Sequence, residues 1–280
     1  MIIDSHTHLF PDAVCSGRQC FFDSEPAFDM LYRSPKSRLV GAAELLAAMD
    51  ENGVDRSVVF GFPWQNPERF RMHNDCIMEA VQRYPGRLIG FGCFDPLARE
   101  SAREAERCLD GGLSGIGELA FYRSEIDAEA LDRLAPVMEL CRDRDRPVLI
   151  HANEPIGHAY PGKAPATLAQ IYRLVKRFPG VTIVLAHWGG GLFFYNLLKK
   201  EVKEALANLY VDTAASPSLY DPAVYRVAID AIGPGKILFG SDYPLLPPRR
   251  YFEEMEEGGL SPRDRAAICG LNAARMLGVH

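Results

Sequence analysis

MIIDSHTH, at residues 1–8, starts as a short apolar stretch and ends on two histidines, and it is the first of eight similar segments in the chain. Each segment is a continuous run of apolar or β-branched residues and does not alternate with polar ones. Such runs are typical of parallel strands that are buried on both faces. The eight predicted strands lie at residues 1–8, 55–62, 88–94, 115–121, 147–153, 182–188, 209–215 and 237–244.

Segments with helical spacing of apolar residues separate these predicted strands. From the second strand onward, successive strands begin 27 to 35 residues apart, which is the length of one β-α unit with short loops. Eight regular units favour a closed α/β barrel, the (β/α)8 or TIM barrel, over an open doubly wound sheet. The predicted helices lie at residues 42–53, 71–86, 126–145, 166–180, 195–208, 221–235 and 261–278.

The length of the chain fits one such barrel. Its 280 residues are close to the roughly 250 of a typical example, so we expect residues 1–280 to form a single domain. The first strand begins 54 residues before the second, and residues 10–40 between them show no clear period. We interpret this stretch as an insertion after strand one, where such barrels place lids and substrate loops.

Composition and charge narrow the class of protein. Hydrophobic residues make up 48% and charged residues 24%, as in ordinary globular proteins, and the net charge of −6 offers no basic face for nucleic acid. No apolar run is long enough to span a membrane, and the first residues do not resemble a secretory signal. Seven cysteines without a C-x-x-C pair favour a reducing, cytoplasmic setting. We expect a small-molecule substrate, no nucleic-acid or membrane partner, and a homodimer.

Histidines and one aspartate fall at the ends of predicted strands, where barrel enzymes carry their catalytic groups. His6 and His8 are two residues apart on strand one, so both side chains point to the same side. His151 ends strand five, and Asp242 ends strand eight, which lies beside strand one in a closed barrel. Three imidazoles and one carboxylate around one point predict a site for a divalent cation with a position open to solvent.

Each of these signals is weak by itself. A single H-x-H occurs often by chance, and a buried histidine at a strand end is more often hydrogen-bonded structure than a metal ligand. His187 adds a further histidine at the end of strand six, and all of these residues fall in register at strand ends. This agreement between motif and context favours a metal site over coincidence.

The segments IIDSHTHLF, LIHAN, LAHWGGG and LFGSDYP, with the closing GLNAARMLG, resemble the amidohydrolase superfamily. Within it they are most similar to the branch that includes aminocarboxymuconate semialdehyde decarboxylase. The resemblance spans residues 2–278 and implies a distorted TIM barrel of the metallo-dependent hydrolase type. It implies that His187 is a catalytic histidine or a ligand of a second ion. The residues that match the metal-binding positions are His6, His8, His151 and Asp242.

Glu118, near the end of the fourth predicted strand, separates two versions of the site. In some amidohydrolases this position carries a Lys or Glu that bridges two ions. If Glu118 bridges, one ion takes the strand-one histidines and Asp242, and the other takes His151 and His187. Otherwise a single ion takes the strand-one pair, His151 and Asp242, and Glu118 is a carboxylate hydrogen-bonded to a ligand. The decarboxylase branch usually lacks this Glu, so its presence favours two ions and hydrolysis.

The expected function is that of a metal-dependent hydrolase acting on a lactone, amide or ester that can carry a carboxylate. A cation such as Zn2+ activates water, Asp242 acts as general base and acid, and His187 polarises the substrate carbonyl. Zinc is the expected ion, although manganese and iron suit the same donors. The first alternative is a non-oxidative decarboxylase of an aromatic or unsaturated acid. The second is a barrel that binds metal without catalysis.

Four further residues are weaker candidates for contact with the substrate. Arg123, just past strand four, can pair with a carboxylate, although such an arginine is more often a solvated loop charge. Asn153 lies two residues after His151 and shares its face of the strand. Trp64 and Trp188 can form walls of the pocket, and their alternative role is simple core packing.

Overall fold

Eight parallel strands, each within one of the predicted apolar runs, form one sheet in sequence order. The computed structural model describes residues 1–279, and the eight strand predictions are confirmed there. The strands are β1 (Ile3–His8), β2 (Arg56–Phe60), β3 (Leu88–Gly92), β4 (Gly115–Leu119), β5 (Val148–Ile150), β6 (Ile183–Leu185), β7 (Leu209–Asp212) and β8 (Ile237–Leu238).

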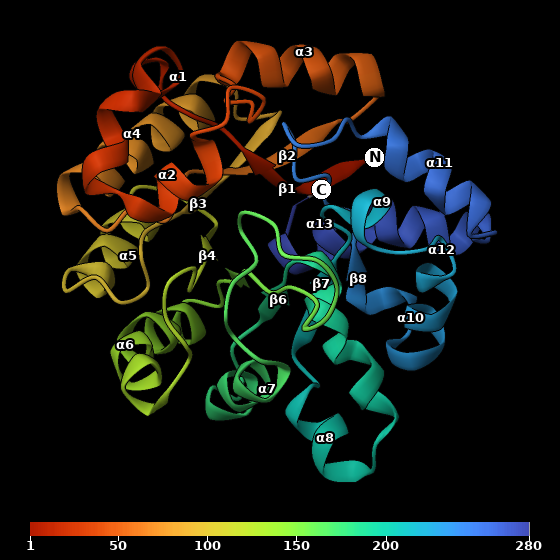
Figure 1. Ribbon diagram of the computed structural model, residues 1–280. Coiled ribbons are helices and arrows are strands. Elements are labelled where there is room, and N and C mark those ends of the chain that lie inside the picture. The colour runs from red at the N-terminus through yellow and green to blue at the C-terminus, as the bar shows by residue number, and fades with distance from the viewer. Residues whose placement is uncertain (280) are drawn as a thin grey trace.

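The sheet closes where β8 meets β1. The Ser5 amide donates a hydrogen bond to the Phe239 carbonyl at 2.8 Å, and the Asp242 amide donates to the His6 carbonyl at 2.9 Å. A parallel bridge between Thr7 and Tyr243 continues the contact beyond the two residues of β8. The predicted (β/α)8 barrel is therefore confirmed, and Figure 1 shows the helices arranged around the strands.

Polar side chains fix the starts of several helices. Asn66 accepts a hydrogen bond from the Glu68 amide at the start of α4, and Pro67 occupies the first helical position. Thr167 and Gln170 form a reciprocal capping box at the start of α7. The helices outside the insertion are α3 (Ala42–Asn52), α4 (Pro67–Arg83), α5 (Ser101–Asp110), α6 (Ala128–Asp143), α7 (Leu168–Arg177), α8 (Lys200–Ala205), α9 (Ser216–Leu219), α10 (Val224–Ile232), α11 (Arg249–Glu257), α12 (Pro262–Ala266) and α13 (Asn272–Leu277).

The helix predicted at 195–208 is shorter than expected. Only α8 is regular there, and the preceding 3-10 segment η2 (His187–Leu197) turns through positive φ angles at Trp188 and the three glycines that follow it. Glycine adopts this left-handed conformation without the steric cost of a Cβ atom, so the run makes a tight turn directly after β6. The predicted helix 261–278 is divided by the π-helical turn η4 (Ala267–Leu271).

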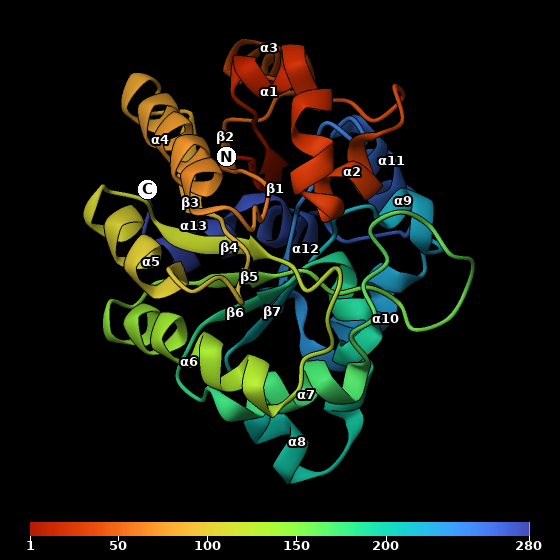
Figure 2. The same cartoon turned by 60° about the vertical axis from the view of Figure 1, so that its left-hand side comes forward.

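The segment after β1 that was predicted to be an insertion is helical, although its sequence shows no clear period. It contains α1 (Asp12–Gly17), the 3-10 helix η1 (Arg18–Ser24) and α2 (Pro26–Tyr32). The Glu25 carboxylate anchors it by accepting hydrogen bonds of 3.0 Å from the amides of Gln65 and Asn66, which follow β2. Figure 2 shows α2 on the same side of the strands as α9. Because α9 directly follows β7, this side is where the strands end, and α2 therefore covers the carboxyl ends of the barrel strands.

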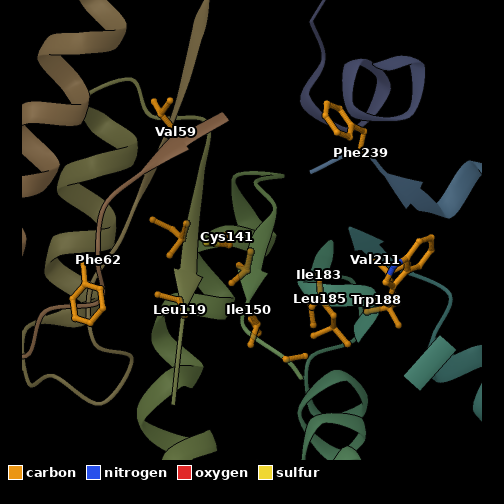
Figure 3. Close-up of a cluster of buried hydrophobic side chains, with 14 of the residues drawn as sticks. Val59, Phe62, Leu119, Cys141, Ile150, Ile183, Leu185, Trp188, Val211 and Phe239 are labelled. Atoms are coloured by element: carbon orange, nitrogen blue, oxygen red, sulfur yellow. The ribbon is translucent and has the colours of Figure 1, made fainter. Parts of the chain in front are cut away.

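Alternate strand residues fill two layers. Val58, Phe60, Leu149, Val184 and Leu238 belong to the inner cluster, which Ala273 and Leu277 of α13 close from below. Their neighbours point outward and pack against the helices. Figure 3 shows part of this outer layer, with Val59, Leu119, Ile150, Ile183, Leu185 and Val211 on the strands. This inner layer fills the interior of the barrel, and polar side chains lie beyond it, at the carboxyl ends of the strands.

Two expectations from the sequence stay predictions. The division of the chain into one domain with an insertion is not tested, and neither is the cytoplasmic location. Across residues 1–279, no helix combines the length and the apolar character needed to cross a bilayer.

Candidate metal centre

Six polar side chains converge at the C-terminal end of the barrel, and sequence analysis had singled out all six. They lie in or shortly after five different strands and are almost completely shielded from solvent, since the most exposed, Asp242, has 14% of its side chain accessible. Phe60, at the top of the inner layer, packs against both histidines of β1. The six are His6, His8, Glu118, His151, His187 and Asp242.

The first group of donor atoms surrounds the β1 histidines. Asp242 Oδ1 lies 3.2 Å from His8 Nε2 and 3.6 Å from His6 Nε2. Glu118 Oε2 lies 3.8 Å from His6 Nε2 and 4.0 Å from His8 Nε2. Donors on a tetrahedral ion with bonds of about 2.1 Å are roughly 3.4 Å apart. The spacing of these atoms therefore fits a divalent cation between them.

The second group uses the other oxygen of Glu118. Glu118 Oε1 lies 2.9 Å from His151 Nδ1 and 3.7 Å from His187 Nε2. The two carboxylate oxygens thus face two different pairs of imidazoles. This is the arrangement expected of a carboxylate that bridges two cations, although His6, His187 and Asp242 also bring one donor atom each within 4.8 Å of one another.

Hydrogen bonds outside the cluster orient two of the imidazoles. His6 Nδ1 lies 2.8 Å from Asp212 Oδ2, and His187 Nδ1 lies 3.0 Å from the Ala214 carbonyl oxygen. Each Nδ1 donates to its oxygen partner, so each Nε2 is the nitrogen directed into the cluster and the one that a bound cation would use. His6 Nε2 is buried and has no hydrogen-bond partner within residues 1–279. A nitrogen held in this way is prepared to bind a metal ion.

His151 is oriented in the opposite sense. Its Nε2 lies 3.0 Å from the carbonyl oxygen of Gly162, so this nitrogen donates and Nδ1 faces Glu118. The segment after β5 therefore fixes which nitrogen of His151 the cluster can use. Each of the three imidazoles thus has one nitrogen held by a partner outside the cluster and the other directed into it, and the donor set fits a divalent cation.

The backbone at two of these residues adopts an uncommon conformation. His187 has φ 54° and Asp242 has φ 55°, and a non-glycine residue in the left-handed region costs of order 1–3 kcal/mol. Two glycines allow the close approach of neighbouring segments. A Cβ atom on Gly240 would lie 2.7 Å from His6 Cβ, and one on Gly190 would lie 2.2 Å from the Asn153 carbonyl oxygen. Such features are typical of functional sites that the surrounding structure holds in place.

The carboxylates give the cluster a strongly negative character. Burial alone would lower the pKa of His6, but Asp212 and Glu118 outweigh it and raise this pKa to about 10. Burial likewise lowers the pKa of His187, and the hydrogen bond to Glu118 reverses the shift. Burial would raise the pKa of Asp242, yet the neighbouring histidines bring it below its usual value. The cluster therefore favours positive charge, which bound cations would supply.

The two tryptophans lie in the packed core. Trp64 is fully buried and donates from Nε1 to His73 Nδ1 at 2.8 Å. Trp188 is also fully buried and donates to Ser216 Oγ, and Figure 3 shows it beside Val211 in the layer outside the strands. The structure does not bring either indole into the cluster, so substrate contact by these residues stays a prediction.

Asn153 and Arg123 lie at the same end of the barrel in different environments. Asn153 accepts a hydrogen bond from the Ala164 amide at 2.8 Å and donates to the Glu154 carbonyl, so it holds the segment after β5. Arg123 is exposed and lines a cavity of about 340 Å³ together with Tyr122. None of the six cluster residues lines this cavity, and the substrate contacts of Asn153 and Arg123 stay predictions.

Sequence reasoning missed three residues around the centre. Asp212 holds His6 and also accepts the amide hydrogen of His187 at 2.9 Å. It ends β7, so its position at a strand end was a signal that could have identified it. Tyr122 packs against His151, with ring centroids 5.0 Å apart, and Tyr32 packs against Phe10, which stacks on His8. Nothing in the sequence around the two tyrosines indicated this.

Comparison with known proteins identifies the family. The amidohydrolase family model, Amidohydro_2, matches residues 3–279. The chain belongs to the amidohydrolase family. This confirms the resemblance seen in the sequence and the prediction of an enzyme from this superfamily.

Similar proteins within and around the family include several decarboxylases. γ-Resorcylate decarboxylase of Polaromonas sp. strain JS666 is 25% identical over 279 residues, covering 81% of this chain and 84% of the relative. The crystal structure of 5-carboxyvanillate decarboxylase from Sphingomonas paucimobilis matches with a TM-score of 0.75 and 22% identity, over 100% of this chain and 99% of that chain. A 5-carboxyvanillate decarboxylase from Novosphingobium aromaticivorans, with bound manganese, has a TM-score of 0.80 and 18% identity, over 100% and 97% of the two chains.

These comparisons reverse the order of the two functional expectations from the sequence. They support the decarboxylase alternative better than the hydrolase that sequence analysis placed first. They support a divalent cation and a small-molecule ligand, and the ion named is manganese, so zinc in particular gains no support.

Proposed function

We propose that this amidohydrolase is a divalent-cation-dependent, non-oxidative decarboxylase of an oxygenated aromatic carboxylic acid. The observation that carries the proposal is a His and carboxylate cluster at the mouth of a barrel that resembles aromatic-acid decarboxylases along its whole length. The substrates named for those relatives are hydroxybenzoic acids. Such acids carry a carboxylate and a ring oxygen, which a cation bound to this cluster of acidic and imidazole groups could hold.

Two cations fit the donor set best. The first would be held by His6, His8 and Asp242, the second by His151 and His187, with one oxygen of Glu118 facing each group. A bound cation would hold the substrate carboxylate together with an adjacent oxygen and stabilise negative charge that develops there. Manganese and zinc both accept these donors.

Asp242 is the residue best suited to move the proton. Its pKa is lowered by its histidine neighbours although burial opposes this, so it is ionised at neutral pH and can act as a base. A hydroxyl group next to the substrate carboxylate gives its proton to Asp242, which passes the proton to the ring carbon that carries the carboxylate. The carbon–carbon bond then breaks, CO2 leaves, and its electron pair restores the ring. The products are CO2 and a phenolate, so atoms and charge balance.

One observation keeps hydrolysis as a second candidate. Each oxygen of Glu118 faces its own pair of imidazoles, and sequence analysis associated a bridging residue at this position with hydrolases. In this reaction Asp242 would take a proton from the attacking water and deliver it to the leaving oxygen of a lactone or ester. The same side chains therefore serve either reaction.

Product analysis with one substrate panel separates the two candidates. The manganese-loaded and zinc-loaded proteins are incubated with 2,6-dihydroxybenzoate, 5-carboxyvanillate and the lactone 2-pyrone-4,6-dicarboxylate in 18O-labelled water. Release of CO2 with the matching phenol supports the decarboxylase, whereas 18O in a ring-opened acid supports the hydrolase. Asp242→Asn is the control for each activity. Turnover of the lactone without CO2 from either benzoic acid would overturn the decarboxylase proposal.

A further inference from the structure

Aromatic rings form a continuous wall between two of the candidate ligands, on opposite sides of the centre. Starting at His8 and ending at His151, successive ring centroids lie 6.3, 5.4, 5.9, 6.2 and 5.0 Å apart. Between the two histidines the rings are, in order, Phe10, Tyr32, Phe62 and Tyr122.

The members of this aromatic wall differ in exposure. Phe10 and Phe62 are buried, with 1% and 2% of their surface accessible. Tyr32, the last residue of α2, and Tyr122, in the segment after β4, are partly exposed. The wall therefore presents its two tyrosines, and not its phenylalanines, to a ligand at the centre.

The hydroxyl groups of both tyrosines are without protein partners. Within residues 1–279, no hydrogen bond is made by the hydroxyl of Tyr32 or Tyr122, and each residue is only partly accessible to water. By contrast, Tyr225 donates to Glu254 and Tyr251 donates to the Ser241 carbonyl. Neither oxygen is among the fully buried polar atoms that lack a partner, so both hydroxyls are open to solvent. Two hydroxyl groups beside the candidate metal centre are therefore free to bond a ligand.

We propose that the hydroxyls of Tyr32 and Tyr122 bind the oxygen substituents of the substrate ring and thereby select an oxygenated, planar aromatic acid. The proposal rests on the proposed function for its substrate class. The cations would take the carboxylate, and neutral phenols are suited to the uncharged or phenolate oxygens next to it. Ring edges of the wall would contact the flat substrate.

The electrostatic environment keeps both tyrosines in the form that can donate. Burial raises the pKa of Tyr32, and the charges of Asp242 and Glu118 raise it further. Burial, Glu118 and Tyr32 act on Tyr122 in the same direction. Both side chains therefore stay protonated at neutral pH, and both lie within electrostatic reach of the two carboxylates at the centre.

Binding of two matched probes tests the inference. The probes are 2,6-dihydroxybenzoate and benzoate, which differ only in the ring oxygens, and their dissociation constants are measured by calorimetry on the manganese-loaded protein. We expect Tyr32→Phe and Tyr122→Phe each to weaken 2,6-dihydroxybenzoate binding about 10-fold, as for the loss of one hydrogen bond to a charged or polarised oxygen. Benzoate binding should change less than about 2-fold, because it lacks those oxygens.

Tyr84→Phe is the matched control. Tyr84 is also partly buried, but it precedes β3 and so lies at the opposite end of the barrel. Its substitution should leave the binding of both probes unchanged, and all three variants should retain the metal content and melting temperature of the unmodified protein.

The outcomes distinguish this inference from the proposed function. Equal weakening of both probes would indicate a merely structural role for the tyrosines and overturn the inference. Three other results would also overturn the inference. The variants could keep the preference of the unmodified protein for 2,6-dihydroxybenzoate, the unmodified protein could bind neither probe, or it could bind both equally. Tyrosine-dependent preference without CO2 release would support the inference while the proposed decarboxylation fails.

Discussion

Replacing Asp212 by Asn should disturb the metal centre without removing a single candidate ligand. Asp212 Oδ1 accepts hydrogen bonds from the amides of His187 and Ala214, at 2.9 and 3.0 Å, and Oδ2 lies 2.8 Å from His6 Nδ1. In Asp212→Asn, the single amide oxygen is needed by the two backbone donors. The NH2 group must then face His6.

This exchange forces His6 into the wrong tautomer. Because the Asn NH2 group can only donate, His6 Nδ1 has to accept, and the proton moves to Nε2, which is the nitrogen directed at the cation site. Loss of an interaction that orients a ligand typically weakens metal binding 10- to 100-fold. We therefore expect a loss of about 1.4 to 2.8 kcal/mol in binding free energy.

Competition with a chelator, followed by the manganese content per chain, measures this loss. Asp212→Ala separates the tautomer from the charge, because alanine removes the carboxylate but places no donor against His6. It should weaken binding less than Asp212→Asn. Glu254→Gln is the control for a buried carboxylate, since Glu254 bonds Ser216 and Tyr225 and contacts no candidate ligand. Equal binding by Asp212→Asn and the unmodified protein, or a larger loss in Asp212→Ala, would refute the reasoning.

Three further predictions follow from the same contacts. Glu118→Gln should lower the bound manganese from about two ions per chain to about one, as measured by elemental analysis, and two ions retained in this variant would exclude a bridging role. In ion-free protein, protonated His6 stabilises the fold, because its pKa is raised to about 10. This stabilisation is complete below the unfolded pKa near 6.5 and is lost as the pH rises toward about 10, so the urea midpoint should fall across this window. A rising midpoint would contradict this. Trp64→Phe should reduce the free energy of unfolding by about 1–3 kcal/mol, because it removes a buried hydrogen bond to His73 and part of the core, and leave the KM unchanged; an altered KM at unchanged stability would instead make Trp64 a substrate contact.

The strands and the candidate ligands were predictable because both follow from one physical constraint. A parallel strand buried on two faces must be apolar throughout, so each strand is visible as a continuous run, and a polar residue at its end stands out. His6 and His8 share a face because side chains alternate along a strand. Asp242 meets them because the barrel closes. No knowledge of side-chain packing was needed for these steps.

The surroundings of the site were not predictable in the same way. α2 has only seven residues, too few for a helical period, and its place against the barrel depends on the contact of Glu25 with the segment after β2. Tyr32 gains its position from that contact. Trp64 illustrates the reverse case, because a large aromatic residue after a strand suits a pocket wall and a core equally, and only its burial separates the two. Long-range packing of loops decides these positions, and a local pattern does not record it.

The choice between decarboxylation and hydrolysis depends more on the aromatic wall than on the ligands. Both reactions use a cation and a carboxylate that moves a proton, and Asp242 is placed to be that carboxylate in either reaction. Hydrolysis needs a polar carbonyl presented to water, whereas decarboxylation needs a flat ring held so that a proton reaches the carbon that carries the carboxylate. A wall that runs from His8 to His151 and presents only Tyr32 and Tyr122 favours the flat, oxygenated ring. The proposed role of the wall therefore fits the reaction that the comparisons favour, and the tyrosine variants test that fit.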